Sequence, residues 1–172
     1  NLKFKNMPNW VRNCISVEEK YSEKLEEISK VGLARFYFPL PEDLKETTAP
    51  AKIGDNISEE KSESLINKYE FNNWYEWAIS NWGTKWGCCD NEFKDNEYWF
   101  NTAWCPLSSH VFEKLLKDIP NFKFIWEEEQ GFGQEWICKD GEIKLIREWE
   151  IEWKIEDGEI KSQIKTHEQP PS

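Results

Sequence analysis

The sequence has a deficit of basic residues. Its 172 residues contain 22 Lys and Arg against 33 Asp and Glu, so the formal net charge is −11. Nonspecific affinity for nucleic acid comes mainly from Lys and Arg that displace phosphate counterions. The charge balance therefore argues against a surface that follows a phosphate backbone, and nucleic acid is a disfavoured partner.

Cysteine spacing excludes two common uses of this residue. The five cysteines form no CxxC pair and are odd in number: Cys14, Cys88, Cys89, Cys105 and Cys138. Disulfide frameworks of secreted domains use even numbers, and zinc sites use closely spaced ligand pairs. We expect reduced thiols in a cytoplasmic protein, with no disulfide, no metal site and no cofactor.

Long apolar runs and catalytic motifs are also missing. No stretch approaches the roughly 18 apolar residues that a membrane-spanning helix needs, and nothing resembles a signal peptide or a lipidation motif. The sequence contains no Walker loop, GxGxxG, HExxH, GxSxG or EF-hand pattern. We expect no membrane partner, and the missing motifs favour a protein that is not an enzyme.

Tryptophan is abundant. Eleven residues are Trp and 15% are aromatic, although the hydrophobic share is only 38%. Six of the eleven lie between Trp74 and Leu107. Because a buried aromatic side chain removes about 150–250 Å² from water, we expect this segment in the middle of the core. The chain is long enough for one domain that buries roughly two-thirds of its unfolded surface.

The first third of the chain predicts a strand, a helix and a loop. Alternation over residues 10–17 predicts the strand, and the helix that follows is expected to end at Gly32. Residues 36–41 are predicted to be extended at the edge of a sheet, because their two prolines lack backbone donors. The polar residues 42–63 are the most loop-like segment.

The middle of the chain predicts a helix, a hairpin and a second helix. Apolar residues at helical spacing run from Ser58 or Ser62 to Gly83, with a break at residues 72–73. Trp82 and Trp86 are predicted to be buried structural residues on either side of Gly83. After this helix, two strands at 84–89 and 98–105 are expected to flank a long acidic loop, and a helix is expected at about 110–118.

The last third predicts a strand followed by two tight hairpins. Residues 122–128 alternate cleanly, and the Asp140-Gly141 and Asp157-Gly158 pairs are strong two-residue turn signals. Residues 143–155, between the turns, predict one long strand with a buried face and a wet face. Its end is expected to be covered by the second hairpin or by a second copy of the chain, giving a monomer or a homodimer.

These elements predict an α+β fold. The order strand, helix, hairpin, helix, strand indicates a ferredoxin-like split βαβ antiparallel sheet with helices on one face, extended by C-terminal β-hairpins. A single domain is expected over residues 7–165, with a polar insertion at about 42–63 and a hairpin extension at about 134–165. Residues 1–6 and 166–172 are expected to be flexible termini.

Four motifs carry a family resemblance. They are Met7-Pro-Asn-Trp10, Phe36-Tyr-Phe-Pro-Leu-Pro-Glu-Asp-Leu-Lys-Glu-Thr47, Asn81-Trp-Gly-Thr-Lys-Trp86 and Phe100-Asn-Thr-Ala-Trp-Cys-Pro106. Over roughly residues 7–141 the chain resembles an uncharacterised family of phage and plasmid proteins with a YubB-like, ferredoxin-like domain. The resemblance implies the fold and a mobile-element context, and it carries over no catalytic residue. The Gly87-Cys88-Cys89 run and the acidic strand at 143–155 depart from the family pattern.

Two sets of side chains are candidates for function. A binding surface that is aromatic or acidic is predicted from Trp82, Lys85, Trp86, Trp104, Glu128 and Glu129. Cys105 and His110 are the best pair of nucleophile and base, at a strand end and the next helix start, although a buried inert thiol is the default for such a cysteine.

Three functions follow from these candidates. We expect a non-enzymatic accessory protein of a mobile element that binds a host or phage protein through its acidic or aromatic surface. One alternative is a binder of single-stranded nucleic acid or nucleotides that stacks bases on the aromatic sheet. The other is an enzyme that uses Cys105 and His110.

Overall fold

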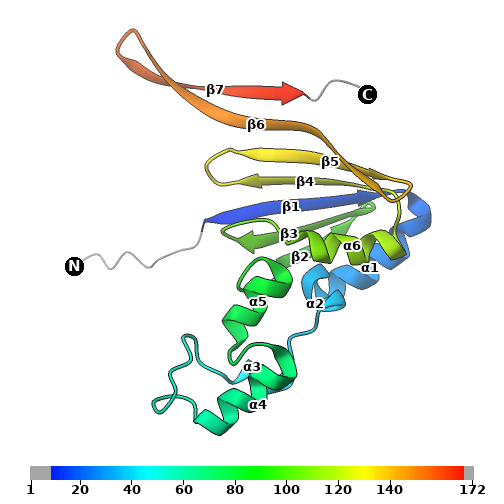
Figure 1. The fold of residues 1–172 in the computed structure, drawn as a ribbon. Coiled ribbons are helices and arrows are strands. Elements are labelled where there is room, and N and C mark those ends of the chain that lie inside the picture. The colour runs from blue at the N-terminus through cyan, green and yellow to red at the C-terminus, as the bar shows by residue number, and fades with distance from the viewer. Residues whose placement is uncertain (1–8, 169–172) are drawn as a thin grey trace.

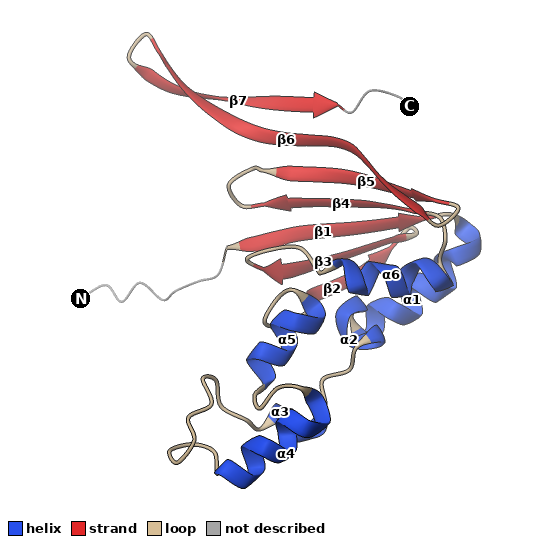
Figure 2. Cartoon of the chain, in the orientation of Figure 1, coloured by secondary structure: helices blue, strands red, loops and turns tan. Residues whose placement is uncertain are grey.

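The structure is a computed structural model that describes residues 9–168, and Figures 1 and 2 show its arrangement of helices and strands. Of the expected flexible termini, residues 1–6 and 169–172 lie outside the described residues, whereas residues 166–168 form the end of strand β7. The strands are β1 (Trp10–Val17), β2 (Cys89–Lys94), β3 (Glu97–Ala103), β4 (Phe122–Glu128), β5 (Gly133–Lys139), β6 (Glu142–Glu156) and β7 (Glu159–Glu168). The helices are η1 (Glu19–Tyr21), α1 (Ser22–Val31), α2 (Leu33–Tyr37), α3 (Glu42–Lys45), α4 (Glu59–Tyr69), α5 (Trp74–Trp82) and α6 (Ser109–Asp118).

All seven strands form one open sheet in the order β2-β3-β1-β4-β5-β6-β7, and every neighbouring pair is antiparallel. The helices lie on one side of this sheet, and the β6–β7 hairpin extends past the others (Figure 1). The predicted α+β class with an antiparallel sheet is confirmed. Both predicted Asp-Gly turns are also present, between β5 and β6 and between β6 and β7.

The core lies between the helices and strands β1, β3 and β4. Apolar side chains alternate along each strand because successive residues point to opposite faces. The largest fully buried side chains on both sides of this interface include Ile15, Tyr98, Phe100, Leu25, Ile28, Val111, Leu115 and Trp82. Each such side chain stabilises the fold by about 1.5–3 kcal/mol, so the packed face holds the domain together.

Gly83 ends α5 and brings it against the start of α6. Its φ of 79° is left-handed, which glycine adopts without a steric penalty. A Cβ at this position would lie 2.8 Å from the backbone nitrogen of Ser108. Trp82, immediately before it, is 1% exposed and donates from Nε1 to the carbonyl oxygen of Phe38 at 2.8 Å. The predicted helix end at Gly83 and the predicted burial of Trp82 are confirmed.

The segment around Phe36 differs from its prediction. Residues 33–37 form α2, which packs against α6, whereas an extended edge was expected over 36–41. The prolines exclude helix only from Pro39 onward, and burial of Leu33 and Ala34 favours one more helical turn before them. Residues 42–45, predicted as loop, are helical as well, and α4 begins directly after Ser58, the earlier of the two predicted helix starts.

The first hairpin is shorter than predicted. Residues 84–88 are bends and irregular backbone rather than a strand, and β2 begins only at Cys89. The turn consists of Asp95 and Asn96, with φ values of 52° and 66°. Asp and Asn tolerate this left-handed conformation better than other non-glycine residues, so a two-residue turn replaces the expected long loop.

Strand β6 changes the face it presents partway along its length. Its pairing with β5 shifts register, because Trp136 pairs with Leu145 whereas Glu135 pairs with Arg147. Ile146 is therefore the extra residue of a β-bulge. Opposed residues of antiparallel strands share a face. Leu145 therefore lies on the helix-covered side of the sheet, as Trp136 does. Arg147 lies on the open side, as Glu135 does.

The prediction of a single buried face along residues 143–155 is therefore wrong. Past the bulge, Trp149 and Ile151 cover the glycines around the β4–β5 turn. A Cβ at Gly133 would lie 2.4 Å from the Trp149 ring, and one at Gly131 would lie 2.2 Å from Ile151. The outer part of β6 pairs with β7 along its edge. Its side chains are nevertheless exposed, because no helix or other strand covers the face of this hairpin within the described residues.

We predict that the two tryptophans around Gly83 contribute differently to stability. Trp82→Ala is expected to lower the free energy of unfolding by about 3–5 kcal/mol, because it removes a fully buried ring. Trp86→Ala is the matched control and is expected to cost less than about 2 kcal/mol, because the Trp86 side chain is 37% exposed. Urea unfolding of both variants measures the difference, and equal losses would contradict this placement.

Candidate functional site

Three tryptophans and a lysine gather where β1 begins and β3 ends. The backbone N–H of Trp104 donates to the carbonyl oxygen of Asn9 at 2.7 Å, directly beside Trp10. The ring of Trp86 lies 5.9 Å from the ring of Trp10. Lys85 lies between the exposed rings. We call Trp10, Lys85, Trp86 and Trp104 the tryptophan–lysine cluster.

Lys85 gives this cluster a fixed positive charge. Its Nζ atom lies 3.8 Å from the ring centre of Trp86 and 5.7 Å from that of Trp104. Each cation–π contact of this kind is worth about 0.5–1 kcal/mol where the site is exposed. Trp86 is 37% exposed and Trp104 is 55% exposed. The cluster therefore presents aromatic surface and a positive charge together at the protein surface.

The backbone around the cluster is held by hydrogen bonds. Thr84, which is buried, donates from Oγ1 to the carbonyl oxygen of Ala103 at 2.9 Å. The backbone N–H of Glu129 donates to the carbonyl oxygen of Trp10 at 3.2 Å. Trp104 has a φ of 74°, an unfavourable conformation for a bulky residue. Strained residues of this kind concentrate at functional sites, which makes Trp104 a candidate contact residue.

A pocket of about 480 Å³ adjoins the cluster. Its walls come from the cluster, the loop before α4 and the start of α5: Ala49, Pro50, Asn73, Trp74, Tyr75, Glu76, Lys85 and Trp86. The Asn73 side chain caps α5 by accepting from the backbone N–H of Glu76 at 3.0 Å, so the first turn of this helix is fixed beside the opening. The pocket can hold an aromatic or apolar group between Trp74 and Trp86.

The sequence-predicted binding residues are only partly brought together. Lys85, Trp86 and Trp104 form the cluster, and Glu129 adjoins it through its backbone bond to Trp10. Glu128 ends β4 nearby and pairs with Val11.

Two of those predictions need correction. Trp82 lies in the core, so its ring cannot form part of a surface, and its role is structural. Trp86 was also predicted to be buried but is partly exposed. The chain leaves Gly83 along the surface in bends and does not enter a strand there.

Trp10 is the residue that sequence reasoning missed. It was assigned to the first strand, and no local pattern marks it as part of a site. Its place in the cluster follows from its pairing with Ala103 across the sheet, which puts it beside Trp104. A contact between residues this far apart in sequence is set by strand register, which a single sequence does not show.

Cys105 and His110 do not form a catalytic pair within the described residues. The Cys105 thiol donates to the carbonyl oxygen of Gly83 at 2.9 Å, and no hydrogen bond joins it to the His110 side chain. Partial burial of the sulfur raises the pKa of the Cys105 thiol above its usual value. A nucleophilic cysteine needs the opposite, a lowered pKa beside a base, so the geometry gives the enzyme alternative no support.

Two further observations concern metal binding and membrane-spanning helices. Within residues 9–168 there is no group of three or more His, Cys, Asp or Glu side chains that could hold a metal ion. None of the helices in that range is long and apolar enough to cross a membrane.

We predict that Cys105 reacts slowly with iodoacetamide although it is exposed. The thiolate is the reactive form, and a raised pKa lowers its fraction at pH 7.5. Alkylation of the folded chain, followed by mass spectrometry of the Cys105 peptide, is expected to be slower than alkylation of a free Ala-Trp-Cys-Pro-Leu peptide. The rate is expected to rise with pH with a midpoint above that of the peptide. Faster reaction of the folded chain would indicate an activated thiol.

Comparison with protein-family models, curated proteins and solved structures finds no match to this chain. The geometry of the cluster is therefore the feature of this chain that points to a function.

Proposed function

We propose that the chain is a non-enzymatic accessory protein of a mobile element, of phage or plasmid type, that binds a host or phage protein through the tryptophan–lysine cluster. The observation that carries the proposal is the exposed pair Trp86 and Trp104 with the Lys85 ammonium between them. Tryptophan is among the residues most enriched in the energetic centres of protein interfaces. Exposed aromatic surface with a polar rim is typical of interaction sites.

The chemistry around the cluster describes the partner. Its rings and the adjoining pocket accept an apolar or aromatic side chain, and Lys85 faces an acidic group or a carbonyl oxygen. Glu128 and Glu129 lie at the neighbouring end of β4, on a chain whose net charge is −11. An acidic surface attracts basic partners and speeds their encounter. The partner therefore has an apolar anchor with an acidic group or carbonyl oxygen beside it for Lys85, and basic residues toward Glu128 and Glu129.

The proposal includes the ferredoxin-like architecture and the family context. The order β4-β1-β3-β2 of the first four strands, with α1 after β1 and α6 after β3, supports a split βαβ unit. Helices α2 to α5 are then an insertion before β2, and β5 to β7 are an extension of the sheet. Membership of the YubB-like family rests on the four sequence motifs, and this strand order is compatible with it.

A pull-down from host lysate with the tagged chain tests the binding proposal. We expect a specific protein to be captured by the unaltered chain and lost with the double variant Trp86→Ala and Trp104→Ala. Ile66→Ala is the matched control, because Ile66 is also an exposed apolar residue but lies on α4, outside both the cluster and the β6–β7 hairpin. Capture that survives the double variant, or no capture above background, would overturn the proposal.

One observation favours the nucleic-acid alternative. On the open face of the sheet, the Arg12 guanidinium lies 4.6 Å from the ring centre of Trp99. Arg12 lies on β1 and Trp99 on β3, at the middle of the sheet, where an aromatic ring could stack on a base. Carboxylates flank this pair, however: the Trp99 Nε1 donates to Glu97 at 3.1 Å, and Glu127 is the cross-strand neighbour of Arg12 on β4. These acidic groups would repel a phosphate backbone.

Fluorescence titration with single-stranded oligonucleotides at low salt separates the two functions. Under the protein-binding proposal we expect no quenching of tryptophan emission. Quenching that weakens with added salt, and that is lost in Trp99→Ala but kept in Trp86→Ala, would favour the nucleic-acid alternative.

A further inference from the structure

The two edges of the seven-stranded sheet are built differently. β2 is short, and its pairing with β3 is interrupted by a register shift between Cys89 and Glu92. β7 spans ten residues and pairs with β6 without a shift. An edge strand presents unpaired N–H and C=O groups, and proteins protect it by shortening or bulging it. Within the described residues β2 has both protections and β7 has neither.

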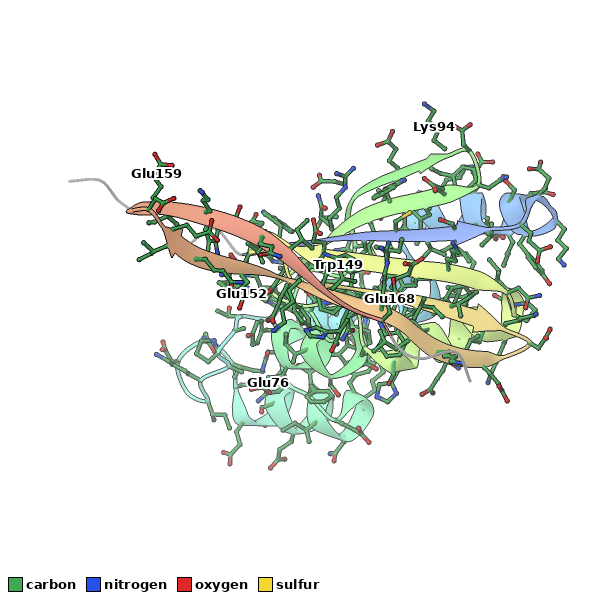
Figure 3. All side chains as sticks on the ribbon, turned by 90° about the horizontal axis from the view of Figure 1, so that it is seen from above. Glu76, Lys94, Trp149, Glu152, Glu159 and Glu168 are labelled. Atoms are coloured by element: carbon green, nitrogen blue, oxygen red, sulfur yellow. The ribbon has the colours of Figure 1, made fainter. Side chains whose placement is uncertain are left out.

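The β6–β7 hairpin also carries an uncovered apolar face. Ile155 pairs with Ile160, and Ile151 pairs with Ile164, so these side chains share one face with Trp153. Exposure is 66% for Trp153, 77% for Ile155, 73% for Ile160 and 66% for Ile164. We call these five residues the hairpin face. Figure 3 shows the hairpin extending past the rest of the sheet, with Glu159 at its tip.

We propose that this edge pairs with a second copy of the chain. β7 of one copy lies antiparallel to β7 of the other, about a two-fold axis that is perpendicular to the sheet and passes between the two Ser162 residues. In this register Ile160 lies opposite the partner's Ile164, and Glu159 lies opposite the partner's Lys165. An interface of this kind is self-complementary, so each contact occurs twice.

Side-chain chemistry selects this register. Ile155, Ile160, the partner's Ile164 and the partner's Ile151 form a row of four across the four strands, and the two-fold axis repeats the row. On the other face each Lys165 lies between its own Glu150, which pairs with it in the hairpin, and the partner's Glu159. Both faces are therefore complementary.

The neighbouring registers place like charges together. A two-fold axis perpendicular to the sheet can place opposite each other only those β7 residues that lie on the same face. The nearest alternative registers therefore shift one β7 strand by two residues relative to the other. A shift in one direction puts Lys161 opposite the partner's Lys165, and a shift in the other direction puts Lys161 opposite the partner's Lys161. Like charges directly opposite each other are destabilising in a sheet.

Backbone geometry agrees with the same pairing. Glu156 and Glu159 close the two-residue turn, and such a closing pair exchanges both of its backbone hydrogen bonds. Along a strand, the backbone N–H and C=O groups of successive residues point alternately to the two neighbouring strands. Those of Glu159 point toward β6, so those of Ile160, Ser162 and Ile164 point away from it. In the proposed register Ser162 opposes the partner's Ser162, so all three residues find outward-facing backbone partners.

A charge swap at the interface tests this register. Glu159→Lys places two lysines opposite each other in the dimer, but within its own hairpin it removes a like-charge pair with Glu156, so the hairpin remains folded. The double variant Glu159→Lys with Lys165→Glu restores opposite charges between the copies. Glu63→Lys on α4 is the matched control, because it makes the same change in net charge at an exposed position far from β7.

Analytical ultracentrifugation over a dilution series measures the outcome. We expect the full chain to be a dimer at micromolar concentration, with a dissociation constant that rises about tenfold in Glu159→Lys because the altered pair occurs twice. The double variant is expected to recover the original affinity, and Glu63→Lys to leave it unchanged. A chain that is monomeric throughout, a dimer that Glu159→Lys does not weaken, a double variant without recovery, or an equal loss in Glu63→Lys would each overturn the proposal.

Discussion

Within residues 9–168, helices cover only one face of the sheet, and this constraint shapes the other features of the structure. On the covered face, strands β1, β3 and β4 contribute large buried side chains such as Ile15, Phe100 and Phe124. On the open face, aromatic residues are retained, and the indole N–H groups of two of them are paired with carboxylates. Trp99 donates to Glu97, and Trp149 donates to Glu127 at 2.7 Å. A ring that is half in water is stable in this position because its polar atom and its apolar body are both satisfied.

The bulge at Ile146 determines which face of the sheet the apolar residues of β6 occupy. Before the bulge, Leu145 follows the covered face, and after it the apolar residues of β6 lie on the open face. That switch allows Trp149 and Ile151 to pack over Gly131 and Gly133, where any larger residue would collide with them. The strand then continues past the sheet with nothing described to cover it, which is why its outer residues remain exposed. Without the bulge, these side chains would lie on the helix side of the sheet.

The parts of the fold that the sequence predicts are those set by local patterns. Strands at residues 10–17 and 122–128 follow from alternation, and the two Asp-Gly turns follow from backbone preferences. The failures have long-range causes. Residues 33–37 are helical because they bury Leu33 and Ala34 against distant elements, and Trp10 joins the cluster through strand register. For the site, Lys85, Trp86 and Trp104 were found from composition, but the burial of Trp82 separates it from them.

The proposed binding cluster and the proposed dimer interface reinforce each other because they lie on different parts of the molecule. The cluster lies where β1 begins and β3 ends, three or more strands from β7 in the sheet. Pairing through β7 therefore leaves Trp86 and Trp104 free on both copies. A dimer presents two clusters related by a two-fold axis, and a partner with two binding segments would engage the second one intramolecularly. Modest contacts such as a lysine between two exposed rings then suffice for stable association, since avidity multiplies their effect without any new contact.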